Sequence, residues 1–540
     1  MLSVDIQVRS HIAELDRRKT MQFVSDPPVS VKIQKMEERV RWQADAIVDR
    51  GIDQTRLVLA DGQEDHSEFS FLVIGDSGSG QHQGHSPQRR IAEQMLKHRC
   101  DSRFVLHTGD VIYLVGSSEF YLKNFIKPYR EFIVGGEHYS RISHDQMVFN
   151  LPFLPVPGNH DYYDLPFAYG LAIQLSYPIR RLLQSKLDFD IGWHGSFQGK
   201  AYAQAFLDML RPIDLRGELG DHLDRHYTAK TDTGLCLCYE PGQFTRLPNR
   251  YYTFRSGGID FFALDSNTFN EPAPLPKTSE GQAYRRALET RYAAVELEMK
   301  QLLESSEKLN PEQPQDAIEI DDIRVKLEQL EEVQRDIRKQ LNAGESTVSD
   351  LAQLEWLRDR LIQSWRTESV RGRVLFFHHP PYVTEATKWH QAQTLAVRRR
   401  LRQVLDEVAE AVGSTKGRAI VDLVLNGHAH CLEYLRTTDT GHADANTNWI
   451  VCGGSGYSLR RQKVEGAELT ESLDGRGEIL VAKSQLFVGR EGRGTQKRRP
   501  YSFLRIDVQS GEPVKFVIRP FVSEWFQGKW HDQALPEFVI

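Results

Sequence analysis

Five short polar motifs carry residue types that bind metal ions. They are Gly-Asp-Ser-Gly at 75–78, Gly-Asp-Val-Ile-Tyr at 109–113, Gly-Asn-His-Asp at 158–161, His-His-Pro at 378–380 and Gly-His-Ala-His at 427–430. Carboxylates, imidazoles and amide oxygens are the ligands from which transition-metal sites are built. A single Gly-Asp pair is a common turn and a single His-x-His is often a surface feature. Together, the five motifs indicate one metal site.

Apolar runs precede most of these motifs. They occupy residues 69–74, 104–106, 153–156, 374–377 and 420–425. Near-continuous apolar runs of about four to eight residues are typical of strands that are covered on both faces. Layered α/β proteins assemble their sites from the loops at the carboxyl ends of such strands. We therefore expect the motifs to meet at one edge of a β-sheet core.

The ordered set of motifs resembles that of the calcineurin-like metallophosphoesterase superfamily, and most closely its purple acid phosphatase branch. That branch has Asp-x-Gly where other members have Asp-x-His, and it adds a Tyr to the second motif. Here Gly78 stands where the His would be, and Tyr113 follows Asp110 by three residues. Supporting matches lie at 261–267, 353–357 and 449–456. The resemblance covers about residues 69–457 and implies an α/β fold, a four-layer α/β/β/α metallophosphoesterase sandwich.

The resemblance also implies ligands for two metal ions. Asp110 would bridge the ions, and the ligands of the first ion would be completed by Asp76, Tyr113 and His430. Those of the second ion would be completed by Asn159, His378 and His428. His378 is preferred to His379 because the family places this ligand two residues before a proline, and Pro380 stands there.

Two further residues are expected to act on the substrate. In the family the histidine at the place of His160 is not a ligand but faces the phosphate, where it can donate a proton to the leaving oxygen. Asp161 is expected to orient that imidazole, as carboxylates often do for catalytic histidines. Three other polar residues are expected to be structural: His107 as a packed strand residue, and Asp265 and Asn267 as loop caps.

The ligand types bear on the identity of the metals. A phenol, with an ordinary pKa of about 10, binds as phenolate only to a strongly polarising cation, so Fe(III) is expected beside Tyr113. The second site, with an amide and two imidazoles, suits divalent Fe, Mn or Zn. If Tyr113 instead points into the core, a Mn or mixed-divalent pair is the alternative.

These residues predict hydrolysis of phosphate esters. Two cations about 3.5–4 Å apart lower the pKa of a bound water and clamp the phosphoryl oxygens. A metal-bound hydroxide would attack phosphorus in line, and His160 would assist departure of the alcohol without a covalent phospho-enzyme. We expect a dinuclear-metal phosphoesterase, and within that class a phosphomonoesterase. The alternatives are a phosphodiesterase or nuclease, and a scaffold protein with a vestigial metal core that acts through a helical hairpin.

The chain is expected to divide into an accessory segment at 1–67, with one helix, and a phosphoesterase domain at 68–540. Residues 280–345 interrupt the domain, and prolines separate two apolar stripes there, so we expect an inserted helical hairpin. This hairpin either packs on itself and the core or serves as an arm for a protein partner or self-association. A β-hairpin is expected at about 500–520.

Composition narrows the class of protein. Of the 540 residues, 40% are apolar and 26% charged, and the net charge of -6 argues against a mainly electrostatic nucleic-acid binder. No run reaches the roughly 18 apolar residues that span a membrane, and the first residues lack the features of a secretory signal. Five cysteines without a pairing framework fit a reducing compartment. We expect a cytoplasmic protein with a phosphorylated substrate and no membrane partner.

Overall fold

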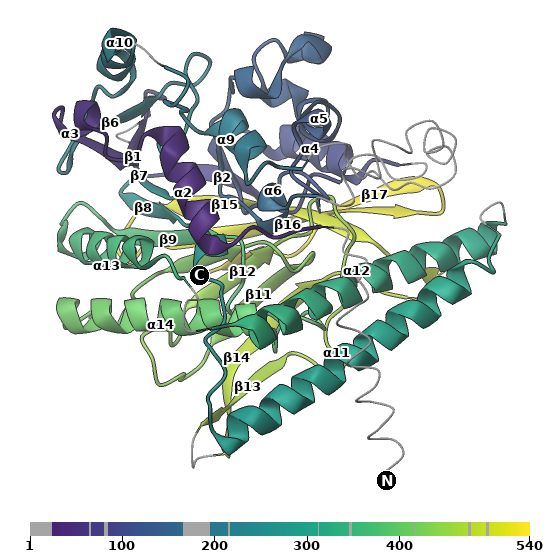
Figure 1. The fold of residues 1–540 in the computed structure, drawn as a ribbon. Helices are drawn as coiled ribbons and strands as arrows, with labels where there is room; N and C mark the ends of the chain where they lie inside the picture. The colour runs from purple at the N-terminus through teal and green to yellow at the C-terminus, as the bar shows by residue number, and fades with distance from the viewer. Residues whose placement is uncertain are drawn as a thin grey trace.

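Two large β-sheets form the centre of the computed structural model (Figure 1). The structure describes residues 24–63, 66–79, 85–165, 195–213, 216–310, 313–344, 348–415, 417–473, 477–492 and 496–540. In spatial order, the larger sheet consists of β13 (Glu468–Leu473), β14 (Gly477–Val488), β11 (Leu432–Thr437), β12 (Asn448–Cys452), β10 (Leu423–Asn426), β9 (Gly372–Phe377), β8 (Ile259–Ala263), β7 (Tyr252–Ser256), β1 (Ile52–Leu59), β6 (Gly234–Tyr239) and β5 (Ala229–Thr231). The smaller sheet consists of β17 (Lys529–Ala534), β16 (Lys515–Phe526), β15 (Pro500–Gln509), β2 (Phe69–Ile74), β3 (Ser102–His107) and β4 (Phe153–Pro155), with β18 (Phe538–Val539) paired to β16.

Helices cover the sheets and fill the connections. They are α2 (Val29–Val40), α3 (Asp45–Val48), α4 (Pro87–His98), α5 (Ser118–Tyr121), α6 (Asn159–Tyr162), α9 (Lys200–Phe206), α10 (Arg216–His226), α11 (Ser279–Ser306), α12 (Pro314–Asn342), α13 (Leu351–Arg366) and α14 (Ala392–Val412). Short 3₁₀ or π turns are η1 (Leu122–Ile126), η2 (Arg130–Phe132), η3 (Gly136–Arg141), η4 (His144–Gln146) and η5 (Ser266–Thr268).

The main hydrophobic core lies between the two sheets. Phe71 of β2 meets Phe261 of β8 edge to face, with ring centres 5.5 Å apart. On the outer face of the larger sheet, Phe377 packs in a second core with Leu357 of α13 and Leu401 of α14. Helix α4 lies against β15 and β16 of the smaller sheet. Helices, sheet, sheet and helices thus form four layers, and the predicted α/β fold class is confirmed.

The accessory segment differs from the sequence-based prediction. Helix α2 lies where a helix was expected, and its Met36 and Val40 are buried. Residues 1–23 lie outside the described part of the chain. The segment also contributes β1, which pairs in parallel with β6 and β7. The first core strand therefore begins at Ile52 and not at Phe69, and β1 was missed because its polar first half, Asp-Gln-Thr-Arg, interrupts the apolar signature of a buried strand.

The segment for which a helical hairpin was predicted contains the antiparallel helices α11 and α12 (Figure 1). Residues 311–312 and 345 of this segment lie outside the described residues. The two helices share a small core formed by Leu288, Val295, Leu330, Val333 and Ile337. Helix α12 also lies against α14. At the C-terminal end, β15 and β16 form an antiparallel hairpin in which Pro500 pairs with Glu524 and Gln509 with Lys515.

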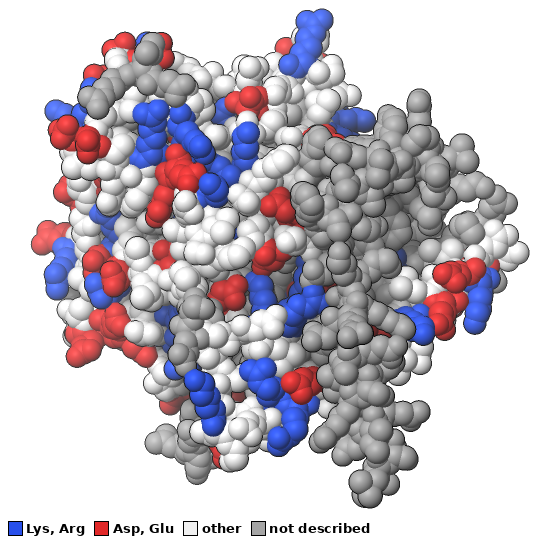
Figure 2. Space-filling model, viewed as in Figure 1, with Lys and Arg blue, Asp and Glu red and all other residues white. Residues whose placement is uncertain are grey.

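Charges of both signs are interspersed over the described part of the face in Figure 2. No continuous basic surface that could follow a polyanion is visible on that part of the face. Among the described residues, no helix is long and apolar enough to cross a membrane. The five cysteines all lie among the described residues, and none of them forms a disulfide there.

Candidate metal centre

The motifs lie where strands of the two sheets end. Asp76 follows β2, Asp110 follows β3, Asn159 begins α6 after β4, His378 follows β9, and His428 follows β10. Strands β2, β3 and β4 run parallel to one another, as do β9 and β10. Because the sheets face each other, the carboxyl ends of both parallel sets meet in one place.

A first cluster forms around the Tyr113 hydroxyl. That oxygen lies 2.8 Å from Oδ1 of Asp76, 2.7 Å from Oδ2 of Asp110 and 3.1 Å from Nε2 of His430. The Tyr113 ring stacks on Tyr457, with ring centres 3.8 Å apart, and this contact fixes the direction of the phenol. The four residues that the resemblance assigns to the first ion are therefore in mutual contact, and the hydroxyl of Tyr113 points into the site.

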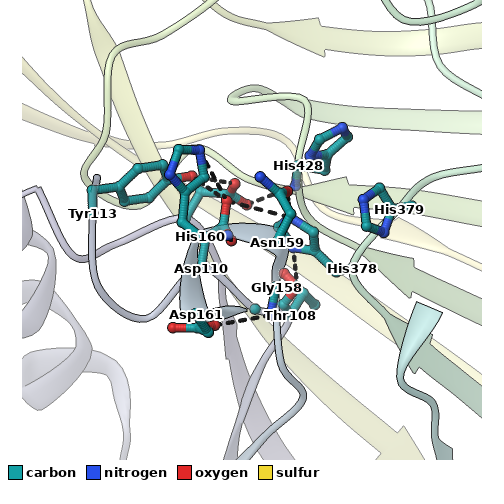
Figure 3. A network of polar contacts seen from close by, with 12 residues as sticks. Thr108, Asp110, Tyr113, Gly158, Asn159, His160, Asp161, His378, His379 and His428 are labelled. Atoms are coloured by element: carbon teal, nitrogen blue, oxygen red, sulfur yellow. Dashed lines mark hydrogen bonds and ion pairs between the residues drawn. The ribbon is translucent and has the colours of Figure 1, made fainter. Parts of the chain in front are cut away.

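A second cluster shares the Asp110 carboxylate. Nε2 of His378 lies 2.9 Å from Oδ1 of Asn159 and 3.3 Å from Oδ2 of Asp110 (Figure 3). Its other ring nitrogen, Nδ1, lies 2.9 Å from the Thr108 carbonyl oxygen, and donation to that oxygen leaves Nε2 of the neutral ring with a free lone pair. The His379 ring instead bonds to the Ser266 hydroxyl at 2.8 Å, away from Asp110. This geometry favours His378 over His379 as the candidate ligand.

His428 borders the second cluster, but its Nε2 is engaged elsewhere. This atom lies 2.9 Å from Nζ of Lys388, 3.2 Å from Nε2 of Gln393 and 3.4 Å from Oε1 of Glu332. Lys388 and Glu332 form an ion pair. Binding of a metal by His428 would therefore require Lys388 to turn away. Sequence reasoning missed Lys388 and Glu332, because neither belongs to a motif and α12 brings the glutamate in from the insertion.

The candidate proton donor is held beside Asp110. The backbone N–H of His160 donates to Oδ1 of Asp110 at 2.8 Å, and Nε2 of His160 lies 4.0 Å from Oδ2. Nδ1 of His160 lies 2.5 Å from the Leu114 carbonyl oxygen. That carbonyl orients the imidazole and leaves Nε2 facing the carboxylate.

The structure turns the Asp161 carboxylate toward backbone N–H groups and not toward the His160 ring that it was expected to orient. Its carboxylate accepts from the backbone N–H groups of Gly158 at 2.8 Å, Val111 at 3.1 Å and Ile112 at 3.3 Å. His160 and Asp161 are consecutive residues of α6, and consecutive helical side chains point about 100° apart. Asp161 therefore faces the loop that carries Asp110, on the opposite side from the imidazole (Figure 3).

The backbone is strained at four candidate ligands. The φ angles are 54° at Asp76, 55° at Asp110, 68° at His428 and 44° at His430. This left-handed region is rare for residues with a side chain, and each such residue costs about 1–3 kcal/mol. Strain of this kind persists where surrounding contacts impose it, and it is typical of functional sites.

Glycines let the backbone close around the carboxylates. A Cβ on Gly427 or Gly453 would lie 2.6 or 2.8 Å from Oδ2 of Asp76, and one on Gly158 would lie 2.1 Å from Oδ1 of Asp110. A Cβ on Gly78 would lie 1.8 Å from the Val111 carbonyl oxygen. No histidine could stand at position 78 without moving the loop that leads to Tyr113.

The two carboxylates lack a charged partner other than histidine among the described residues. Burial raises the pKa of Asp76 to about 7, and the negative charge of Asp110 adds to the effect. Burial alone would lower the pKa of His378, but Asp110 and Asp76 raise it to about 9. Carboxylates, a phenol, an amide oxygen and imidazoles buried together form a donor set that fits metal cations. Asp76, Asp110 and His378 form one group that could hold an ion, and His378, His379 and His428 form another.

The residues expected to be structural have structural contacts. Nε2 of His107 lies 2.9 Å from the Ser77 hydroxyl inside the core. Asp265 accepts from the backbone N–H of Asn267 at 3.2 Å and from the Tyr162 hydroxyl at 2.7 Å. The side chain of Asn267 donates to the Pro157 carbonyl oxygen at 2.9 Å. These predictions are confirmed.

Comparison with known proteins gives similarity to solved structures only. No family model matches the sequence, and no curated protein matches it. The chain is similar to GAP50, the anchor in the inner membrane complex of Plasmodium, at 11% identity and a TM-score of 0.35, over 87% of this chain and 89% of that one. It is similar to purple acid phosphatase PPD1 from yellow lupin (Lupinus luteus) seeds at 11% identity and a TM-score of 0.39, over 88% and 54%. It is similar to PhoD at 11% identity and a TM-score of 0.36, over 87% and 69%. A proposed function therefore rests on the residues of this chain.

Gly78→Ala tests the close packing of the Asp110 loop. The added methyl group would displace Val111 and so shift Asp110, and we expect a loss of about 1–3 kcal/mol of stability and weaker metal binding by at least about tenfold (about 1.4 kcal/mol). Gly217→Ala is the control, because nothing lies within 4 Å of its added Cβ. Urea unfolding and metal titration measure both effects. Metal binding by Gly78→Ala equal to that of the wild type would contradict the geometry.

The raised pKa of His378 makes metal binding pH-dependent. Below its pKa of about 9, the metal-free histidine holds a proton that must leave before Nε2 can bind a cation. Apparent metal affinity should rise about tenfold per pH unit through neutral pH, with release of about one proton from this residue. Calorimetry in buffers of different ionisation enthalpy counts the protons. His378→Asn should release about one proton fewer than the wild type when metal binds. Equal proton release by both proteins would contradict the prediction.

Proposed function

We propose that this chain is a dinuclear-metal phosphoesterase that hydrolyses phosphate monoesters. The observation that carries the proposal is the buried Asp110 carboxylate, which is shared by two clusters of metal-binding donors. The Oδ2 atom of Asp110 lies 2.7 Å from the Tyr113 hydroxyl in one cluster and 3.3 Å from Nε2 of His378 in the other. A carboxylate between two donor sets is the arrangement that a bridged metal pair requires.

The residues that would hold the metals follow from the two clusters. Asp76, Tyr113 and His430 would bind one ion, Asn159, His378 and His428 the other, and Asp110 both. Two bound cations supply an activated water and neutralise charge on the phosphoryl oxygens. Because the Tyr113 phenol contacts both carboxylates, we favour Fe(III) in the first site with Fe, Mn or Zn in the second, and a Mn or mixed-divalent pair is the alternative.

His160 would move the proton to the leaving oxygen. The Leu114 carbonyl fixes the ring through Nδ1, so Nε2 is the atom that faces the substrate. Burial lowers the pKa of His160 to about 4, and the nearby Arg335 adds to the effect. Because only the protonated ring can donate, we expect turnover to be favoured by acidic pH.

Two other functions are the alternatives to a phosphomonoesterase. A phosphodiesterase or nuclease needs an open groove, and the centre here is buried: Asp76 and Asp110 are inaccessible to solvent. A scaffold protein would act through the inserted hairpin, where Tyr284, Leu297 and Leu303 of α11 are exposed apolar side chains that a protein partner or a second copy could cover. We favour the phosphomonoesterase, and the five cysteines without a pairing framework lead us to place it in the cytoplasm.

Release of alcohol from an aryl phosphomonoester and the matching diester tests the reaction. The purified chain should hydrolyse the monoester faster when Mn, Fe or Zn is supplied. Asp110→Ala and His428→Ala should each lower kcat/KM at least about 10³-fold, since each removes a metal ligand. His138→Ala, on an exposed side chain, is the control. Absence of turnover with every metal would refute the enzyme assignment and favour the scaffold.

The pH profile tests the role of His160. With a proton donor whose pKa is below neutral, kcat should fall as pH rises through 5–8, by up to about tenfold per unit. His160→Ala should lose about 10²–10⁴-fold in kcat and also lose this fall with pH, while its metal content stays unchanged. An alkaline limb that persists in His160→Ala would assign the proton donor elsewhere.

A further inference from the structure

Hydrogen bonds and an ion pair hold helix α12 of the inserted hairpin next to the candidate metal centre. Asp336 accepts from the backbone N–H groups of Ala392 at 2.8 Å and Gln393 at 3.0 Å, at the start of α14. Arg460 donates to the Val325 carbonyl oxygen at 3.0 Å. Glu332 pairs with Lys388 beside His428. One face of α12 is thus turned toward the proposed catalytic residues.

Arg335 lies on this face, three residues after Glu332 and therefore beside it on the helix surface. Its guanidinium carbon lies 4.9 Å from the centre of the Tyr163 ring. The Tyr163 ring in turn lies 4.9 Å from the His160 ring. The guanidinium is close enough to contribute to the lowered pKa of His160. An inserted element thus brings a permanent positive charge to the side of the centre where the leaving group would depart.

The Arg335 guanidinium lacks acceptors that would satisfy it. Its Nε and Nη1 atoms are both buried, and neither has a hydrogen-bond partner among the described residues. A buried donor without an acceptor destabilises the folded protein, and more so when the donor is charged. The group cannot lose its proton to escape this cost.

The two cations that follow Arg335 on α12 both have acceptors. Arg338 donates to the Tyr292 hydroxyl at 2.6 Å, and Lys339 pairs with Asp26 at 2.6 Å. Both also lie on α12, one turn or less from Arg335. Of these three cations, Arg335 is the one with buried nitrogens that have no hydrogen-bond partner among the described residues.

We infer that Arg335 binds a phosphate oxyanion of the substrate, so that the inserted hairpin recognises substrate. This inference rests on the proposed function. A guanidinium presents paired N–H donors that match two phosphate oxygens, and it binds phosphate more strongly than it would a neutral acceptor. The oxyanion belongs either to the scissile phosphoryl group or to a second phosphate on the leaving group, because Arg335 lies on the His160 side.

Arg335→Met and Arg335→Lys test the inference in the metal-loaded full chain. Steady-state rates are measured on an aryl phosphomonoester and on inorganic pyrophosphate. Arg335→Met should raise KM at least tenfold on one or both substrates, with a smaller change in kcat. The KM of Arg335→Lys should lie between those of Arg335→Met and the wild type. Lys326→Met is the matched control, since Lys326 is an exposed cation on the same helix that pairs only with Glu298, at 3.3 Å, among the described residues.

The two substrates distinguish the sources of the oxyanion. A raised KM on both substrates would mean that Arg335 binds the scissile phosphoryl group. A raised KM on pyrophosphate alone would mean that it binds a second phosphate. KM values within twofold of wild type on both substrates would overturn the inference.

Calorimetric binding of inorganic phosphate and pyrophosphate separates this inference from the proposed reaction. If the wild type hydrolyses neither substrate but binds either anion at least tenfold more tightly than Arg335→Met does, Arg335 recognises phosphate and the proposed reaction fails. If the wild type hydrolyses the ester and Arg335→Met matches it in KM and in anion binding, only the inference fails. Thermal unfolding with and without phosphate checks folding: both proteins should melt cooperatively, and phosphate should raise Tm less in Arg335→Met.

Discussion

The centre of this protein depends on two carboxylates buried side by side. Asp76 and Asp110 both contact the Tyr113 hydroxyl, and both are fully buried. Like charges in a water-free interior repel strongly, so such a pair persists only with compensating positive charge. In the protein alone, His378 supplies part of it, because its pKa is raised to about 9. Bound metal cations would supply the remaining positive charge that the two buried carboxylates need.

The surrounding structure holds these carboxylates at a cost. Left-handed backbone at Asp76 and Asp110 turns each side chain inward from the end of its strand. Glycines at 427 and 158 then allow the neighbouring loops to approach within contact of the carboxylate oxygens. Two packed sheets make this possible, because each supplies a parallel set of strand ends. The inserted helix α12 lies beside this centre and adds Glu332 and Arg335, which belong to no motif.

Much of the centre could be predicted because its signals are local. Asp76, Asp110 and His378 each lie within four residues of the end of a strand-like apolar run, so sequence alone places them at strand ends. The contacts around Nε2 of His428 include Glu332, which comes from the inserted helix α12 and from no motif. The direction of the Asp161 side chain depends on the turn of α6, which a Gly-Asn-His-Asp motif does not specify. Strand β1 was missed because its polar first half hides the apolar pattern, so only its pairing with β6 and β7 reveals it.

Anomalous diffraction from crystals grown with Mn would test the shared role of Asp110 most directly. A bridged pair predicts two metal peaks on either side of the Asp110 carboxylate, one among Asp76, Tyr113 and His430 and one beside Asn159 and His378. A single peak among His378, His379 and His428, or none in crystals of folded protein, would contradict a dinuclear centre at this carboxylate.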